Sequence, residues 1–157
     1  MDQPVYASVG YSAECRDCGD ETECRGVQAL TDGRLRWDVE SACSACGSAA
    51  AVCGGDLPAE LRERILLVHG PATLRIEGPA VDRVTVMRVL RAELGLDLAS
   101  AKAVLRQVLD GEHSGTRPEM ERPARALRRS GVAAVAARLR AEGVRGDQGA
   151  SAKRASG

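Results

Sequence analysis

The sequence predicts an α+β fold built from two small parts of different character. All six cysteines and all three aromatic residues lie before residue 54, between strand-like segments. The rest of the chain lacks aromatic residues and shows strand and helix signals in the order β-α-α-α-β, which is typical of a two-layer domain. At 157 residues the chain is long enough for two such parts.

Two cysteine pairs in the first part have the same C-x2-C-G spacing and are separated by 24 residues. A C-x2-C turn directs two thiolates at one tetrahedral metal, and the following glycine permits the positive φ that this position often needs. We therefore expect four thiolates to bind one Zn²⁺ in a structural site, because the protein would fill every coordination position. These ligands are Cys15, Cys18, Cys43 and Cys46.

A disulfide pair or a reactive dithiol is the alternative interpretation of the four cysteines. The chain starts Met-Asp-Gln-Pro-Val-Tyr and shows neither the basic nor the apolar region of an export signal. We therefore expect a cytoplasmic protein, in which thiols stay reduced and are available to a metal.

Cys24 and Cys53 each follow one of the two pairs by a similar gap. Six cysteines in this order resemble the binuclear zinc cluster of fungal DNA-binding regulators. The 18-residue middle spacer is too long for that family, and the residues around the first three cysteines are acidic where that family is basic. We favour one zinc ion with Cys24 and Cys53 as small buried side chains, and keep further metal ligation as the alternative.

The predicted elements of the first part follow a zinc-ribbon plan over residues 1–56. Residues 5–14 and 34–41 are expected to be extended, and Thr31-Asp32-Gly33 supplies a hairpin turn between the strands that lead from one cysteine pair to the other. A connecting helix is expected over residues 57–70, starting near Pro58 and ending at His69-Gly70.

The second part is expected to be a domain over residues 71–140. Asp82 and Asp97 are predicted to cap two helices, Gly131 to end a third, and Pro123 to kink that third helix. The predicted order is a strand at 72–77, helices at 82–94 and 98–109, a loop at 110–116, a helix at 118–130 and an apolar stretch at 132–137. The composition of residues 141–157 predicts a disordered tail.

Residues 72–137 resemble the C-terminal domain of the bacterial large-subunit ribosomal stalk protein, the L-seven/L-twelve type. The stretch Asp82-Arg-Val-Thr-Val-Met-Arg-Val-Leu-Arg91, then Leu94-Gly-Leu-Asp-Leu98 and Ala101-Lys102, is similar to that family's N-K-V-x-V-I-K-x-V-R, G-L-G-L and E-A-K signature. The family uses this helix pair to recruit translational GTPases. The resemblance implies a partner-binding surface made of Arg83, Val84, Met87, Arg88, Arg91, Leu98 and Lys102.

Helical periodicity gives the first of these helices two different faces. At 100° per residue one face carries Val86, Val89 and Leu90, as expected for a core. The other face mixes two apolar residues with two arginines, a combination that suits protein binding. The alternative is that the apolar pair, Val84 and Met87, only widens the core face.

Charge is unevenly distributed although the formal net charge is zero. Residues 1–70 hold 6 Arg and 12 acidic residues, whereas residues 71–157 hold 16 basic and 10 acidic residues. The basic second part therefore favours an acidic partner. No apolar run reaches membrane-spanning length, so no membrane partner is expected.

The sequence offers no assembly of catalytic groups. It has no Ser/His/Asp set, no glycine-rich phosphate loop and no open metal triad, and its two histidines fit a helix end (His69) and a polar loop (His113). We therefore expect a non-enzymatic adaptor that binds an acidic protein, such as a translational GTPase or the ribosome. A nucleic-acid-binding zinc-ribbon regulator is the alternative, although the acidic first part argues against phosphate contacts, and an immunity or antitoxin protein is another.

Overall fold

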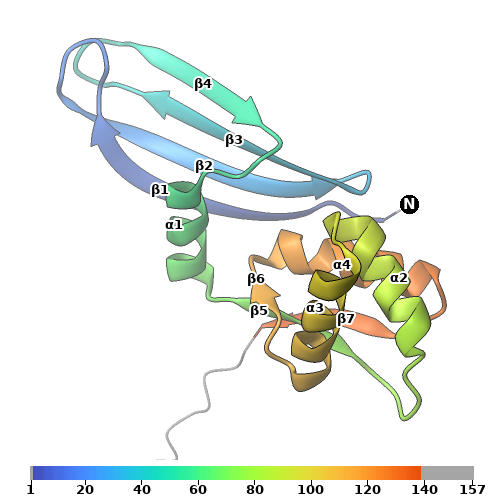
Figure 1. The fold of residues 1–157 in the computed structure, drawn as a ribbon. Helices are drawn as coiled ribbons and strands as arrows, with labels where there is room; N and C mark the ends of the chain where they lie inside the picture. The colour runs from blue at the N-terminus through green and yellow to red at the C-terminus, as the bar shows by residue number, and fades with distance from the viewer. Residues whose placement is uncertain (1, 139–157) are drawn as a thin grey trace, which may run out of the picture.

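The computed structural model describes residues 2–138, in which a helix lies between two antiparallel sheets (Figure 1). The first sheet has the order β1 (Val5–Glu14), β2 (Glu21–Thr31), β3 (Arg34–Ala42), β4 (Ala49–Gly54). The second has the order β6 (Ser114–Gly115), β5 (Ala72–Ile76), β7 (Ala134–Arg138). The helices are α1 (Ala59–His69), α2 (Arg83–Leu94), α3 (Leu98–Asp110) and α4 (Arg117–Arg129). The predicted tail lies outside the described residues.

The mixed α+β class is confirmed, and most predicted elements are found within a few residues of their expected bounds. The predicted hairpin turn is a two-residue turn in which Asp32 and Gly33 both have positive φ, 50° and 74°. β2 was implied only by the hairpin turn that follows it, and β4 and β6 are additions to the predicted set; β6 lies in the predicted loop and pairs with β5. α4 continues through Pro123 as one helix.

Side-chain caps fix where the helices of the second part begin. The Asp82 carboxylate accepts from the main-chain N–H groups of residues 84 and 85, and Asp97 accepts from Ser100, so both predicted caps are confirmed. α4 starts with a capping box in which Thr116 and Glu119 each accept from the other's main-chain N–H.

The first sheet has one covered face and one solvent face. The register places Val9 opposite Gly26, and Gly26 opposite Val39, so these residues share a face. α1 lies against this face and buries Leu61 and Ile65 on it. The opposite face carries charged side chains, which is the usual pattern when an antiparallel sheet is covered on one side.

The close approach of α1 to the sheet depends on a glycine in β2. A Cβ placed on Gly26 would collide with a methyl group of Leu61. The absence of a side chain at this position therefore lets the helix sit directly on the strand.

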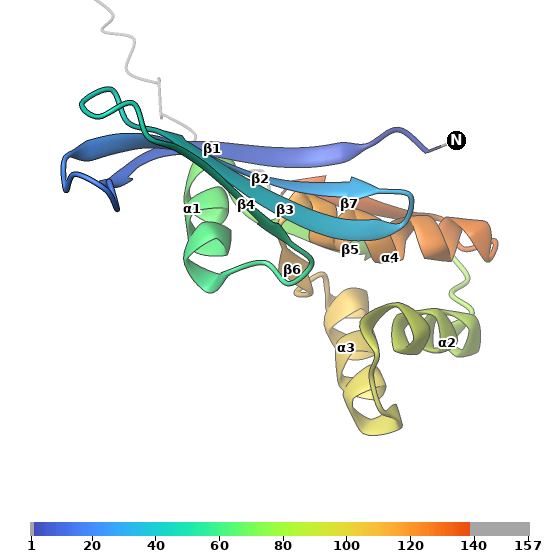
Figure 2. The ribbon, with the colours of Figure 1, turned by 90° about the horizontal axis from the view of Figure 1, so that it is seen from above.

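The second sheet and three of the helices, α2, α3 and α4, enclose a larger core. β5 contributes Leu74, α2 contributes Val86 and Leu90, and α4 contributes Leu127, all fully buried. Figure 2 shows α2 and α3 on the side of α4 away from the first sheet. This core uses only aliphatic residues and methionine, as the composition requires.

α4 joins the two sheets, because it packs against β5 and β7 and also against β1, β2 and β3. The Thr116 hydroxyl donates to the Gln28 side-chain oxygen, and both side chains are almost fully buried. Beside them, Arg62 of α1 forms a two-pronged ion pair with Glu119 at 2.9 Å. The expected parts at 1–56, 57–70 and 71–140 are thus in direct contact, and their boundaries as domains stay a prediction.

Replacing Gly26 by alanine should destabilise the fold, because the added methyl group must displace Leu61. Overpacking of this kind costs about 1 to 3 kcal/mol of unfolding free energy, measurable by urea denaturation of the metal-loaded chain. Gly10→Ala on β1 is the matched control, since its nearest foreign atom lies 4.0 Å from the new Cβ. Equal losses in the two variants would contradict this account.

Replacing Thr116 by valine should also destabilise the chain, since the Gln28 oxygen would then be buried without its donor. The expected loss is about 1 to 3 kcal/mol, and hydrogen exchange should rise at α4 and the adjoining strands. Asp97→Ala removes an exposed cap and serves as control, with a cost of about 1 kcal/mol confined to α3. If the Thr116→Val variant is as stable as the control, the contact between Thr116 and Gln28 contributes little to the stability of the chain.

Candidate metal centre and exposed helix face

The four predicted ligands lie on two identical turns at one end of the first sheet. In the β1–β2 loop the Cys15 N–H donates to the Asp20 carbonyl at 2.7 Å, and the Gly19 N–H donates to the Cys15 carbonyl at 2.9 Å. The β3–β4 loop repeats both bonds around Cys43, at 2.8 and 2.9 Å. Both C-x2-C-G motifs therefore form the same tight turn.

The glycines of these turns behave as expected. Gly19 and Gly47 have φ values of 79° and 76°, in the left-handed region that favours glycine. Any other residue type there would strain the turn that aims the two thiols.

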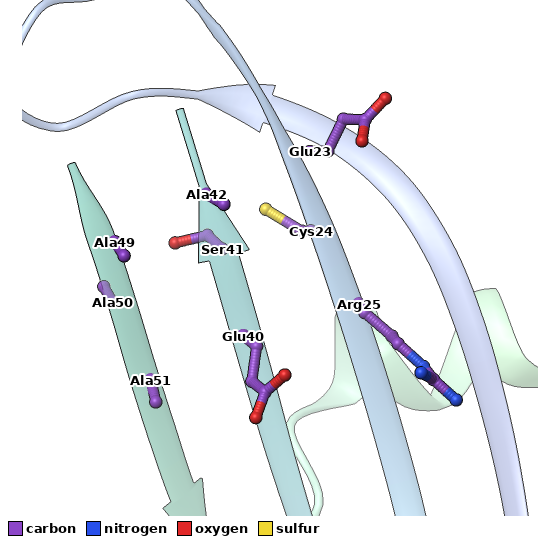
Figure 3. Close-up of a pocket in the computed structure, with 9 residues that line it drawn as sticks. All are labelled: Glu23, Cys24, Arg25, Glu40, Ser41, Ala42, Ala49, Ala50 and Ala51. Atoms are coloured by element: carbon purple, nitrogen blue, oxygen red, sulfur yellow. The ribbon is translucent and has the colours of Figure 1, made fainter. Parts of the chain in front are cut away.

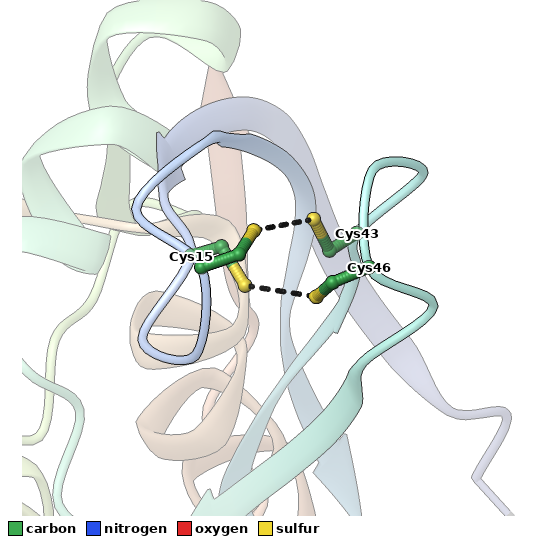
Figure 4. A group of neighbouring side chains, drawn as sticks. Cys15, Cys43 and Cys46 are labelled. Atoms are coloured by element: carbon green, nitrogen blue, oxygen red, sulfur yellow. Dashed lines mark hydrogen bonds between the residues drawn. The ribbon is translucent and has the colours of Figure 1, made fainter.

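The four sulfur atoms converge on a single point (Figure 4). The Cys15 and Cys46 sulfurs are 3.8 Å apart, those of Cys18 and Cys43 are 3.6 Å apart, and all four lie within 4.8 Å of one another. A tetrahedral ion with metal–sulfur bonds of about 2.3 Å requires sulfur–sulfur distances of roughly 3.8 Å. The cluster can therefore hold one tetrahedral metal ion.

The electrostatics of the cluster also suit a cation. Main-chain N–H groups of Cys46 and Ala45 lower the pKa of Cys43 to about 7. For Cys46 the Ser48 N–H acts in the same direction, but the neighbouring thiols, together with local desolvation, outweigh it and raise the pKa to about 12. Four thiolates this close repel one another, and a divalent cation removes that repulsion.

Cys24 and Cys53 stand apart from the cluster. Cys24 on β2 is buried, as expected, opposite Tyr11 and on the covered face of the sheet. Cys53 on β4 is exposed, so the interpretation of it as a buried side chain is wrong. It lies on the solvent face, opposite Asp38. Among the described residues the four-cysteine group is the one cluster of potential metal ligands.

Neither histidine belongs to the metal cluster. His69 ends α1, and its Nε2 donates to the Ser8 carbonyl at 2.7 Å, which ties the helix end to β1. His113 is half-buried, and burial lowers its pKa, which favours the neutral form of the ring.

The outer face of α2 forms a shallow groove of about 720 Å³. Four of the seven predicted partner-binding residues line it, joined by two that the sequence did not single out. These six residues, the α2 groove hereafter, are Val84, Met87, Arg88, Arg91, Ala92 and Leu96. The predicted opposite face, Val86, Val89 and Leu90, is buried.

Exposure decides between the two interpretations of the apolar pair on α2. Val84 is 69 % exposed and makes no contribution to the core. Met87 packs partly against the core, so the alternative interpretation holds for that residue in part. Leu96 follows the left-handed Gly95 that ends α2, and its carbonyl accepts from Arg91 at 3.4 Å.

The other three predicted residues, Arg83, Leu98 and Lys102, do not line this groove. Leu98, the first residue of α3, is 47 % exposed. In the part of the chain that is described, no arginine of α2 forms an ion pair. Arg88 instead donates to the Thr85 hydroxyl at 3.1 Å, which leaves its positive charge uncompensated by a salt bridge.

Comparison of the chain with protein-family models, with curated proteins and with solved structures gave no match. No helix among residues 2–138 is long and apolar enough to cross a membrane.

Replacing Cys43 by serine should abolish metal binding, because it removes one of four convergent sulfur ligands. Native mass spectrometry should show one metal ion per wild-type chain and none in the variant. Cys53→Ser is the matched control and should keep the ion, since Cys53 is exposed and outside the cluster. Two ions per wild-type chain, or loss of metal from the control, would contradict the single site.

Proposed function

We propose that the chain is a non-enzymatic, zinc-containing adaptor that binds an acidic protein through the α2 groove. One observation carries the proposal. The four residues that helical periodicity predicts on one face of α2 also line a single groove in the structure: Val84, Met87, Arg88 and Arg91. An exposed apolar strip edged by guanidinium groups is the composition found at protein-binding surfaces.

Zinc is the metal that fits this proposal best. Four thiolates in a closed tetrahedral set are typical of structural zinc, and they leave no position for water or substrate. Cys15 and Cys43 are buried beneath the turns, while Cys18 and Cys46 are exposed at the tip. The ion would hold the two turns together and take no part in a reaction.

The charge of the groove supports an acidic partner. Arg88 and Arg91 project from one face of α2, and neither has an acidic side chain bound to it in the described residues. A partner that presents carboxylates beside an apolar side chain would pair both arginines and cover Val84. The resemblance to the ribosomal stalk domain makes translational GTPases and the ribosome the first candidates.

Reversing both charges, Arg88→Glu with Arg91→Glu, should weaken partner binding at least tenfold, which corresponds to about 1.4 kcal/mol. Binding of the zinc-loaded chain to purified ribosomes and to translational GTPases is the measurement. Thermal stability should stay unchanged, because neither arginine holds a structural ion pair. A large loss of stability, or undiminished binding, would contradict the proposal.

The matched control is Arg75→Glu with Arg106→Glu, which makes the same change of net charge on β5 and α3, outside the groove. Unchanged binding in this control separates the groove from a general charge effect. Binding to RNA or DNA that falls steeply with salt would instead favour the nucleic-acid-binding alternative.

A further inference from the structure

The two edges of the first sheet differ in how they are protected. Along β1, helix side chains bind main-chain carbonyls: His69 of α1 donates to Ser8, and Arg125 of α4 donates to Gln3 just before the strand. α1 and α4 both pack against β1. The protein itself therefore covers part of this edge.

The other edge, β4, has no comparable cover among the described residues. The strand reads Ala-Ala-Ala-Val-Cys-Gly, and all but its last residue are exposed. It packs chiefly against β3, and the sheet edge lies away from the helices in Figure 1. An edge strand presents a row of unpaired N–H and C=O groups, and natural proteins usually protect it with charges, proline or a covering element. β4 contains neither a charged residue nor a proline.

We infer that β4 pairs antiparallel with β4 of a second copy of this chain, which would join the two four-stranded sheets into one across a two-fold axis. The binding partner of this edge should be an extended strand, because only a strand can hydrogen-bond to the successive free N–H and C=O groups of β4. The side chains of β4 favour a second copy of this chain as that strand, because all of them are small and uncharged and can oppose their own copies without a clash.

Self-pairing of β4 is sterically simple. With Ala51 on the two-fold axis, Ala50 faces Val52 of the second copy and Ala49 faces Cys53, so every opposed side chain is small and uncharged. Val52, now 50 % exposed, would lose solvent contact. Figure 3 shows the three alanines of β4 beside the charged side chains of β2 and β3.

The charges nearest to β4 do not oppose this pairing. Asp38 and Glu40 of β3 stand opposite Cys53 and Ala51. Strands are spaced about 4.8 Å apart, so β3 of one copy and β3 of the other would lie roughly 14 Å apart. That distance exceeds the Debye length of about 8 Å at physiological ionic strength, and the repulsion between these carboxylates is largely screened.

Sedimentation velocity of the full zinc-loaded chain tests the inference. The wild type should sediment as a dimer, and Ala51→Lys should sediment as a monomer because two lysines would meet near the axis. Lysine should not disturb the fold, since residue 51 is exposed and opposite Glu40. Ala51→Ser keeps the small side chain and should remain dimeric, and Ser12→Lys on β1, an equal charge on the other edge, should do the same.

A wild type that stays monomeric at high micromolar concentration would overturn the inference, and so would an Ala51→Lys variant that still dimerises. Hydrogen exchange on the wild type gives a second readout that needs no variant. Amides of β4 should exchange slowly in the concentrated sample and faster on dilution, while β3 stays unchanged. Exchange in β4 that does not depend on concentration would equally overturn the inference.

Discussion

The fold depends on the burial of α4 between two sheets. A helix normally has one apolar face, yet α4 buries residues all round, among them Met120, Ala124 and Leu127. The buried polar groups of α4 have partners between the two sheets. Arg125, only 7 % exposed, forms an ion pair with Glu121 and also donates to the Gln3 carbonyl. Buried charge is tolerated here because each group has a partner. Without α4, the β1 side of the first sheet and the face of β5 would both be open to water.

This arrangement explains why a metal ion would be needed at only one end of the first sheet. α4 and the Gln28 contact hold the end where β1 begins, and α1 covers the middle through Leu61 and Ile65. The end that carries the cysteine turns has no helix over it, as Figure 1 shows. Four convergent thiolates at that end can replace a hydrophobic core, because a bound ion crosslinks the two turns directly. A bound metal ion and the helices would thus stabilise opposite ends of the same strands.

Local signals in the sequence predicted the parts of the structure that local chemistry determines. The C-x2-C-G spacing predicted the thiol cluster, the aspartates at 82 and 97 predicted helix starts, and Asp32-Gly33 predicted the hairpin. Each of these depends on a few neighbouring residues. The stripe on α2 was predictable for the same reason, since helical geometry alone places residues 84, 87, 88 and 91 on one side.

What escaped sequence analysis depends on contacts between distant segments. α4 reads as a polar surface helix with five arginines, and its burial follows only from partners such as Gln28, 88 residues from Thr116. β4 was missed because a run of alanines favours helix as much as strand, and pairing with β3 decides the matter. The exposure of Cys53 follows from that register.

The same contacts connect the metal centre to the α2 groove. The cysteine turns fix the ends of β1 to β4, those strands pack on α4, and α4 packs against the core face of α2. Since α2 presents its opposite face as the groove, the position of that face depends on α4. The cysteine turns and the groove are therefore connected through a continuous series of packed strands and helices. Packing of this kind would limit the backbone freedom that α2 loses if a partner binds the proposed groove, which would favour affinity without any new contact.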